Sequence, residues 1–169
     1  MICSDREMAY REEIKFFSTT FYVILGALVL TALFFQTGGI SAVLPIIILA
    51  GILPLLFGRL LISISAHTLH IQFGYTGFMK KDIHVSAIKA ARVVTYKPLR
   101  QFGGWGIRCG KFEGMKTGCY SMRGDKGVLL ELTHTVRVCL TKTDRVIIGV
   151  NSPEKLIAAL GDIGVRVNS

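Results

Sequence analysis

The stretch GVLLELTHTVRVCLTKTDRVIIGV, residues 127–150, decides the class of the folded part of this chain. Apolar and polar residues alternate late in GVLLELT and throughout TVRVCLT, and RVIIGV is a continuous apolar run. A period of two is typical of a strand with one buried face, and short apolar runs bounded by turn residues are typical of buried strands. Thr143 and Asp144 supply a turn signal before the last run. We therefore expect strands over 127–133, 135–141 and 145–150.

The same strand signals continue upstream. Leu69, Ile71 and Phe73 alternate with polar residues, SAIKAARVVTY (86–96) is rich in β-branched residues, and GCYSM (118–122) is short and bounded by glycine. Turn signals separate these segments at 74–77, 103–106 and 124–125. Short strands at regular spacing predict an antiparallel sandwich or small barrel.

One helix is expected at the C-terminal end, in NSPEKLIAALGDIG (151–164). Ser152 is a suitable N-cap, and Pro153 suits the first helical position because its missing N–H has no intrahelical partner there. The face expected to be apolar contains Leu156, Ile157, Leu160 and Ile163. Such a helix can cover the open end of a small barrel.

The N-terminal third has a different pattern, because no charged residue or histidine occurs from Phe16 to Gly58. A membrane-spanning helix needs about 20 apolar residues, and the stretches Phe16–Phe35 and Ile40–Ile64 each have that length. We therefore expect a two-helix transmembrane hairpin over 16–64, a cytoplasmic segment over 1–15 and a cytoplasmic domain over 65–169. Positive residues flank the hairpin on both sides, which predicts a multi-pass protein of the cytoplasmic (inner) membrane with both termini in the cytoplasm.

With two close spans before it, this order of strands and helix resembles the small bacterial and archaeal membrane proteins that have a cytoplasmic pleckstrin-homology-like (PH-like) domain. The resemblance lies in SAIKAARV, RQFGGWGIR (100–108), GDKGVLLEL (124–132) and RVIIGVNSPEKLIAAL (145–160). It implies a membrane α-hairpin followed by an all-β PH-like barrel or sandwich with one C-terminal capping helix. It implies no catalytic residues.

The expected domain is strongly basic. Residues 66–169 contain sixteen Lys or Arg against seven Asp or Glu. Basic residues near anionic lipid gain about 1 kcal/mol each, so the candidate lipid contacts are Arg59, Lys80, Lys81, Lys111 and Lys116. Aromatic residues and arginine are frequent interface anchors, so the candidate partner contacts are Phe102, Trp105 and Arg108. Trp105 is the only tryptophan. A lone tryptophan between glycines is more often packed in a core, and we expect that here, with the glycines supplying turns.

Few residues suggest catalysis. GKFEGMKT (110–117) has the wrong spacing for a phosphate-binding P-loop, and no helical pattern follows it. Ser63, Ser65 and Ser121 lack the context of an activated nucleophile, and His67 and His70 are expected on opposite faces of a strand. The cysteines have no metal-binding spacing and are expected to be small apolar fillers. We expect no enzyme activity, no metal and no cofactor.

The functional hypothesis is a non-catalytic, membrane-anchored interaction module, an accessory or scaffolding subunit whose PH-like domain docks a protein partner or a larger membrane complex. The alternative is binding of anionic lipid headgroups through the basic face. Association of the chain with itself is a third possibility. Charge alone would allow nucleic-acid binding, but no motif supports it.

Overall fold

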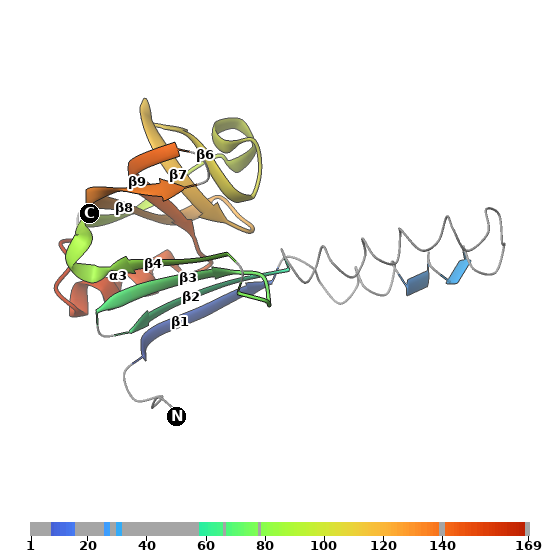
Figure 1. The fold of residues 1–169 in the computed structure, drawn as a ribbon, viewed down its shortest axis with the longest axis horizontal. Coiled ribbons are helices and arrows are strands. Elements are labelled where there is room, and N and C mark those ends of the chain that lie inside the picture. The colour runs from blue at the N-terminus through green and yellow to red at the C-terminus, as the bar shows by residue number, and fades with distance from the viewer. Residues whose placement is uncertain are drawn as a thin grey trace.

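The computed structural model describes residues 8–15, 26–27, 30–31, 58–65, 67–77, 79–138 and 141–167, most of which lie in two β-sheets and helix α3 (Figure 1). Sheet A has the order β1-β2-β3-β4, and each strand is antiparallel to its neighbour. Its strands are β1 (Met8–Lys15), β2 (Arg59–Ser65), β3 (Thr68–Phe73) and β4 (Met79–His84).

Sheet B has the order β5-β8-β9-β7-β6. Its strands are β5 (Ile88–Thr95), β6 (Gly106–Phe112), β7 (Met115–Ser121), β8 (Lys126–Val138) and β9 (Thr141–Gly149). The helical segments are η2 (Val85–Ala87), η3 (Pro98–Phe102) and α3 (Pro153–Asp162). Strand β7 runs parallel to β9, whereas the other pairs in this sheet are antiparallel.

The main core lies between the two sheets. Strand β2 shows how the sequence builds it, because Leu60, Ile62 and Ile64 are fully buried and the residues between them are only partly buried. From sheet B, Leu130 and Ile148 are buried in the same cluster. Full burial of an aliphatic side chain contributes about 1.5–3 kcal/mol, so alternation along the central strands holds the sheets face to face.

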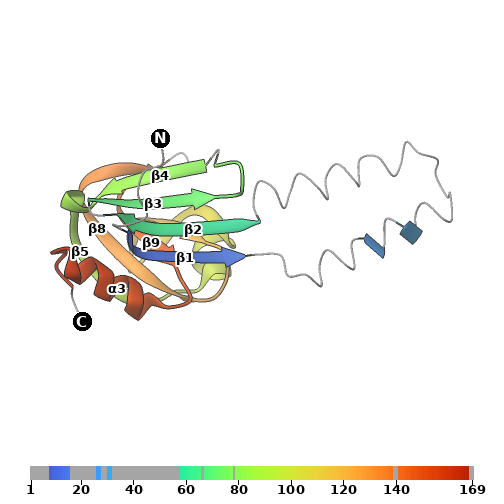
Figure 2. The ribbon, with the colours of Figure 1, turned by 90° about the horizontal axis from the view of Figure 1, so that it is seen from below.

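Helix α3 covers one side of this sandwich. It contacts β1 at one edge of sheet A and β5 and β8 of sheet B, and Figure 2 shows it alongside β1. Leu156 and Leu160 of the helix are fully buried in the main core. The helix predicted from 151–164 is therefore confirmed, with Ser152 at the N-cap and Pro153 at the first position.

The outer face of sheet B has a second, smaller core. Tyr96, Phe102 and Phe112 are buried there with Leu129 and Ile147. The rings of Tyr96 and Phe102 meet edge to face, with 6.0 Å between centroids. Helical turn η3, which contains Phe102, therefore covers part of this face.

The two-span membrane prediction is contradicted by the structure. Among the described residues, no helix is long and apolar enough to cross a membrane. The end of the second predicted span, from Arg59, is strand β2, which pairs with β1 and β3. Helical backbone is described only at residues 26–27 and 30–31 of the first span, and the other residues of 16–57 lie outside the described part. The multi-pass inner-membrane localisation derived from these spans is corrected with them.

The predicted fold class, a membrane hairpin joined to a PH-like barrel, is also wrong. The described residues form nine strands, and they include β1, from the segment predicted to be a cytoplasmic flank. The parallel pairing of β7 with β9 departs from the expected all-antiparallel arrangement. The reason is that the β6–β7 hairpin joins sheet B beside β9, so the sheet order does not follow the sequence order.

A first prediction concerns β1. Ile14 is 2% exposed and lies opposite Leu60 in the β1–β2 register. Ile14→Ala should lower the free energy of unfolding by about 2–5 kcal/mol, because it removes buried methyl groups and leaves a cavity. The measurement is urea unfolding of the full chain. Arg11→Ala, on an exposed position of the same strand, is the control and should change stability by less than about 0.5 kcal/mol. Equal effects would contradict an integral role for β1.

Candidate interaction groove

A groove of about 670 Å³ lies on the side of the sandwich opposite α3. One wall is β4, an edge strand of sheet A, and the other is the start of β6, the edge strand of sheet B. The lining residues from these walls are Met79, Lys80, Lys81, Trp105, Gly106, Ile107 and Arg108, with Tyr120 and Arg137 from neighbouring strands. The two sheets therefore meet here at a hollow, whereas α3 covers the opposite side.

Four cationic residues line this groove: Lys80, Lys81, Arg108 and Arg137. The side chain of Lys80 lies on the outer face of sheet A beside Gln72, and its Nζ would be 3.1 Å from a Cβ at Gly77, so its ammonium group lies at the β3–β4 turn. Within the described part of the chain, none of the four makes an ion pair. Among the described residues, the Arg108 side chain donates one hydrogen bond, from Nε to the Trp105 carbonyl oxygen at 3.3 Å. Like charges that lack counter-charges repel one another, so the groove is an electropositive surface that favours an anionic group.

Apolar side chains form the rest of the lining. Met79 and Ile107 pack against the main core, and the ring of Tyr120 is buried next to that of Phe73. Trp105 is 38% exposed, and its Nε1 donates to the Gly124 carbonyl oxygen at 3.3 Å. The prediction of a core-packed Trp105 is therefore wrong: the glycines on either side place it at the surface. A fixed aromatic ring beside arginine is typical of a binding anchor.

Arg137 reaches the groove because the end of the β8–β9 hairpin packs closely over β7. A Cβ added to Gly118 of β7 would lie 2.7 Å from Cγ2 of Val138. The Cys109 thiol also donates to the Val138 carbonyl oxygen at 2.9 Å. Sequence analysis missed Arg137, since its proximity to Arg108 depends on this packing. It also missed Met79, Ile107 and Tyr120, because nothing in the sequence around them distinguishes them from other strand residues.

The other predicted site residues lie elsewhere. Arg59 is 3.8 Å from Glu13 and stacks over the Tyr75 ring at 4.8 Å from its centroid. Lys111 lines a separate shallow pocket with Lys97 and Arg100, and Lys116 lies opposite Lys111 in the β6–β7 register. Phe102 is buried in the second core. Thus the structure brings together Lys80, Lys81, Trp105 and Arg108 but separates them from Arg59, Phe102, Lys111 and Lys116.

A hydrogen-bonded line of Ser65, His70 and Asp82 crosses sheet A, and sequence analysis did not identify it. Nδ1 of His70 lies 2.7 Å from Asp82 Oδ1, and its Nε2 lies 3.1 Å from Ser65 Oγ. The arrangement has the connectivity of a nucleophilic triad, but in such triads the acid is buried. Here the side chains of His70 and Asp82 are 44% and 60% exposed. We interpret the line as cross-strand hydrogen bonding on a solvated sheet face, consistent with the direct His70–Asp82 pairing.

Metal and thiol chemistry have little support. In the described ranges, no three His, Cys, Asp or Glu side chains are placed to hold a metal ion. Cys119 is fully buried in the second core, where burial raises the pKa of its thiol to about 12. A thiol with that pKa is inert at neutral pH, in agreement with the filler role predicted for it. Cys3 and Cys139 lie outside the described residues.

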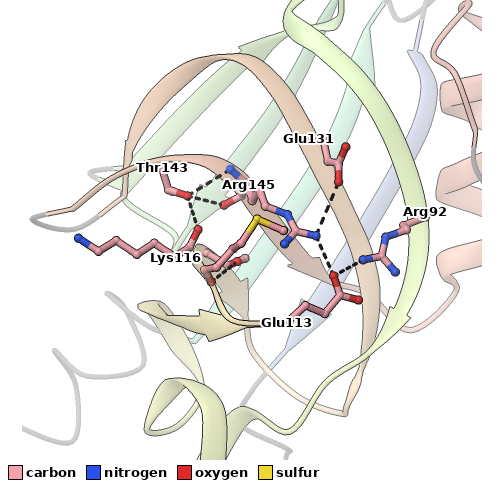
Figure 3. Close-up of polar contacts among 8 residues, drawn as sticks. Arg92, Glu113, Lys116, Glu131, Thr143 and Arg145 are labelled. Carbon is pink, nitrogen blue, oxygen red and sulfur yellow. Dashed lines mark hydrogen bonds and ion pairs between the residues drawn. The ribbon is translucent and has the colours of Figure 1, made fainter.

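An ion-pair cluster lies on the outer face of sheet B, near the β6–β7 turn (Figure 3). Arg145 of β9, whose side chain is only 6% exposed, contacts Glu113 at 2.9 Å and Glu131 at 3.6 Å. Arg92 also donates to Glu113. A hydrogen bond from Arg92, which has the larger effect, and one from Arg145 hold the pKa of the Glu113 carboxyl below its ordinary value.

The pH dependence of stability should report this cluster. Since the pKa of Glu113 is lower in the folded chain, its carboxylate stabilises the fold above the ordinary carboxyl pKa, and this contribution is lost as pH falls through the lowered value. The stability difference between wild type and Glu113→Gln should therefore be largest near neutral pH and shrink in acid. Urea unfolding at pH 2.5–7 measures it. Asp144→Asn, at an exposed position of β9, is the control; a pH-independent difference for Glu113→Gln would contradict the assignment.

The contact at Gly118 gives another prediction. Gly118→Ala should destabilise the fold by about 1–3 kcal/mol, because the added methyl overlaps the stiff, branched Val138 side chain. Double-mutant cycles with Val138→Ala should show that the second change relieves part of that cost. Gly161→Ala is the control, because its methyl would meet only Val167, at 3.6 Å. Strict additivity in the cycle would show that the two residues do not touch.

Comparison with protein-family models, curated proteins and solved structures finds no match to this chain. The resemblance to two-span membrane proteins with a PH-like domain is corrected by the structure, because the described strands do not have the expected architecture and no described helix is long and apolar enough to cross a membrane. Functional inference consequently depends on the geometry of the groove.

Proposed function

We propose that this chain is a non-catalytic interaction module that docks an acidic, extended segment of a partner protein in the groove between β4 and β6. The main supporting observation is the set of three cations, Lys81, Arg108 and Arg137, that have no ion-pair partner among the described residues and lie around an apolar floor and a part-exposed tryptophan. Electrostatic complementarity of this kind favours binding of segments that combine acidic and apolar residues. An accessory or scaffolding role fits such a surface.

The shape of the groove favours a peptide. Strand β4 is an edge of sheet A, paired in the described part of the chain only with β3. An extended segment can align with such an edge, with alternate side chains directed toward the groove. The lysines of β4 also have a simpler role, because charged residues on edge strands discourage aggregation. Arg108, Arg137 and Trp105 are not explained by that role, and they support docking.

The alternative is recognition of an anionic lipid headgroup. A headgroup site needs several cations in one place, and the predicted lipid contacts are dispersed. Lys80 and Lys81 line the groove, Lys111 lines another pocket, and Arg59 lies beside Glu13. This dispersion makes lipid binding the weaker hypothesis, and the experiment below distinguishes the two.

Trp105 provides a direct readout, because it is the only tryptophan and lies in the groove. The probe is a tryptophan-free 12-residue peptide of alternating Glu and Leu or Val, titrated against the full chain while Trp105 fluorescence is recorded. The signal should saturate, and the affinity should fall with added salt. Arg108→Glu and Arg137→Glu should each weaken binding at least about tenfold, because each replaces attraction with repulsion in a partly desolvated site.

Lys111→Glu is the matched control, since it reverses a charge on the same strand as Arg108 but outside the groove. It should leave peptide affinity within about twofold. A parallel titration uses vesicles with and without 30% anionic lipid. No peptide binding, together with vesicle binding that Lys111→Glu and Arg108→Glu weaken equally, would reject the groove proposal and support lipid recognition.

A further inference from the structure

The ion-pair cluster on the outer face of sheet B has more hydrogen-bond donors than the chain satisfies. A guanidinium group has five N–H donors. Among the described residues, Nη2 of Arg145 contacts the carboxylates of Glu113 and Glu131, while its Nε and Nη1 are buried and have no hydrogen-bond partner there. Buried donors without partners are uncommon in proteins and call for an explanation. The cluster therefore has unused capacity for an oxyanion.

Glu113 lies in a turn whose backbone conformation is unfavourable for glutamate. It has φ +53°, and Gly114 has φ +77°, so both central residues of the turn between Phe112 and Met115 are left-handed. Hairpin turns with this geometry favour Asn, Asp or Gly at the first central position, and glutamate gains nothing there from its backbone. Its carboxylate, in contrast, receives hydrogen bonds from Arg92 and Arg145 (Figure 3).

The charges also define which ligand would fit. Arg92, Arg145, Glu113 and Glu131 together are neutral. If the Glu113 carboxylate leaves, the remaining three groups have one net positive charge. The Glu113 side chain is 43% exposed and lies on a hairpin turn, so solvent has access to the position it occupies. One monoanionic carboxylate or phosphate group would restore neutrality, and arginine binds either group through paired N–H donors.

We propose that Arg92 and Arg145 form a binding site for a monoanionic oxyanion, which Glu113 occupies as an internal substitute. A small molecule bearing a carboxylate or a phosphate can take the place of the Glu113 carboxylate and engage the free donors of Arg145. This site lies on the outer face of sheet B and is independent of the docking groove between the sheets.

The test removes the internal carboxylate. Glu113→Gly vacates the position and also relieves the left-handed backbone. The melting temperature of this variant should rise by about 3 °C or more in 50 mM sodium acetate, or in 50 mM phosphate at pH 6, relative to chloride at equal ionic strength. Wild type should respond much less, because its own carboxylate competes.

Two further variants make the result decisive. Glu113→Gly/Arg92→Gln should lose the anion response, since one of the two arginines is gone. Glu113→Asn, whose shorter side chain suits the left-handed turn and leaves the carboxylate position open, should show the response if the glycine variant fails to fold. A response to acetate alone identifies the ligand group as a carboxylate, and a response to phosphate alone identifies it as a phosphate. Melting temperatures of both Glu113 variants that are equal in chloride, acetate and phosphate would overturn the proposal.

Discussion

Burial of the inner faces of the two sheets against each other is the interaction on which the rest of the structure depends. Leu60, Ile62 and Ile64 of β2 can be fully buried only because sheet B supplies residues such as Leu130 and Ile148 on the facing side. Two sheets packed face to face leave the core between them open along two sides. Helix α3 closes the side next to β1 and β5, and the opposite side retains the groove. The position of the candidate site thus follows from where the chain places helix α3.

The hairpin of β8 and β9 links this architecture to the chemistry of the groove. These strands are central in sheet B, and their ends extend beyond a register shift between Glu131 and Val136. Beyond that shift, Val138 lies against Gly118, and Arg137 lines the groove. A side chain at position 118 would push the hairpin end away. The contact between Val138 and Gly118 therefore both packs the core and positions Arg137 at the groove.

Strand character over 127–150 and helix α3 could be predicted from the sequence, because alternation and the Ser152–Pro153 start are local signals. The boundaries were wrong: the predicted strands 127–133 and 135–141 belong largely to one strand, β8, and the predicted turn at Thr143–Asp144 lies inside β9. Strands β1 and β2 could not. Alternation is present in RLLISIS (59–65), but the long uncharged run before it favoured a membrane helix. Only Ile14 is buried among the described side chains of β1, so its pattern resembled a polar flank. In both strands, pairing with distant segments outweighs what the local composition indicates.

The same limit applies to the groove. Lys80, Lys81, Trp105 and Arg108 were chosen for their chemistry and do lie together, but Phe102 was chosen for the same reason and is buried. Residue type selects candidates, and only the approach of β4, β6 and β8 determines which of them meet.

The arginines of sheet B lie in two different environments. Arg145 is buried, and the chain supplies Glu113 and Glu131 to balance it. Burying that charge without a counter-charge would cost several kcal/mol. Arg108 and Arg137 lie beside an apolar floor, and no described carboxylate pairs with them. Such a cost is avoided there because water solvates the open groove. A ligand that displaced the water would have to supply the negative charge itself, so the docking proposed for this groove would select its partner by charge.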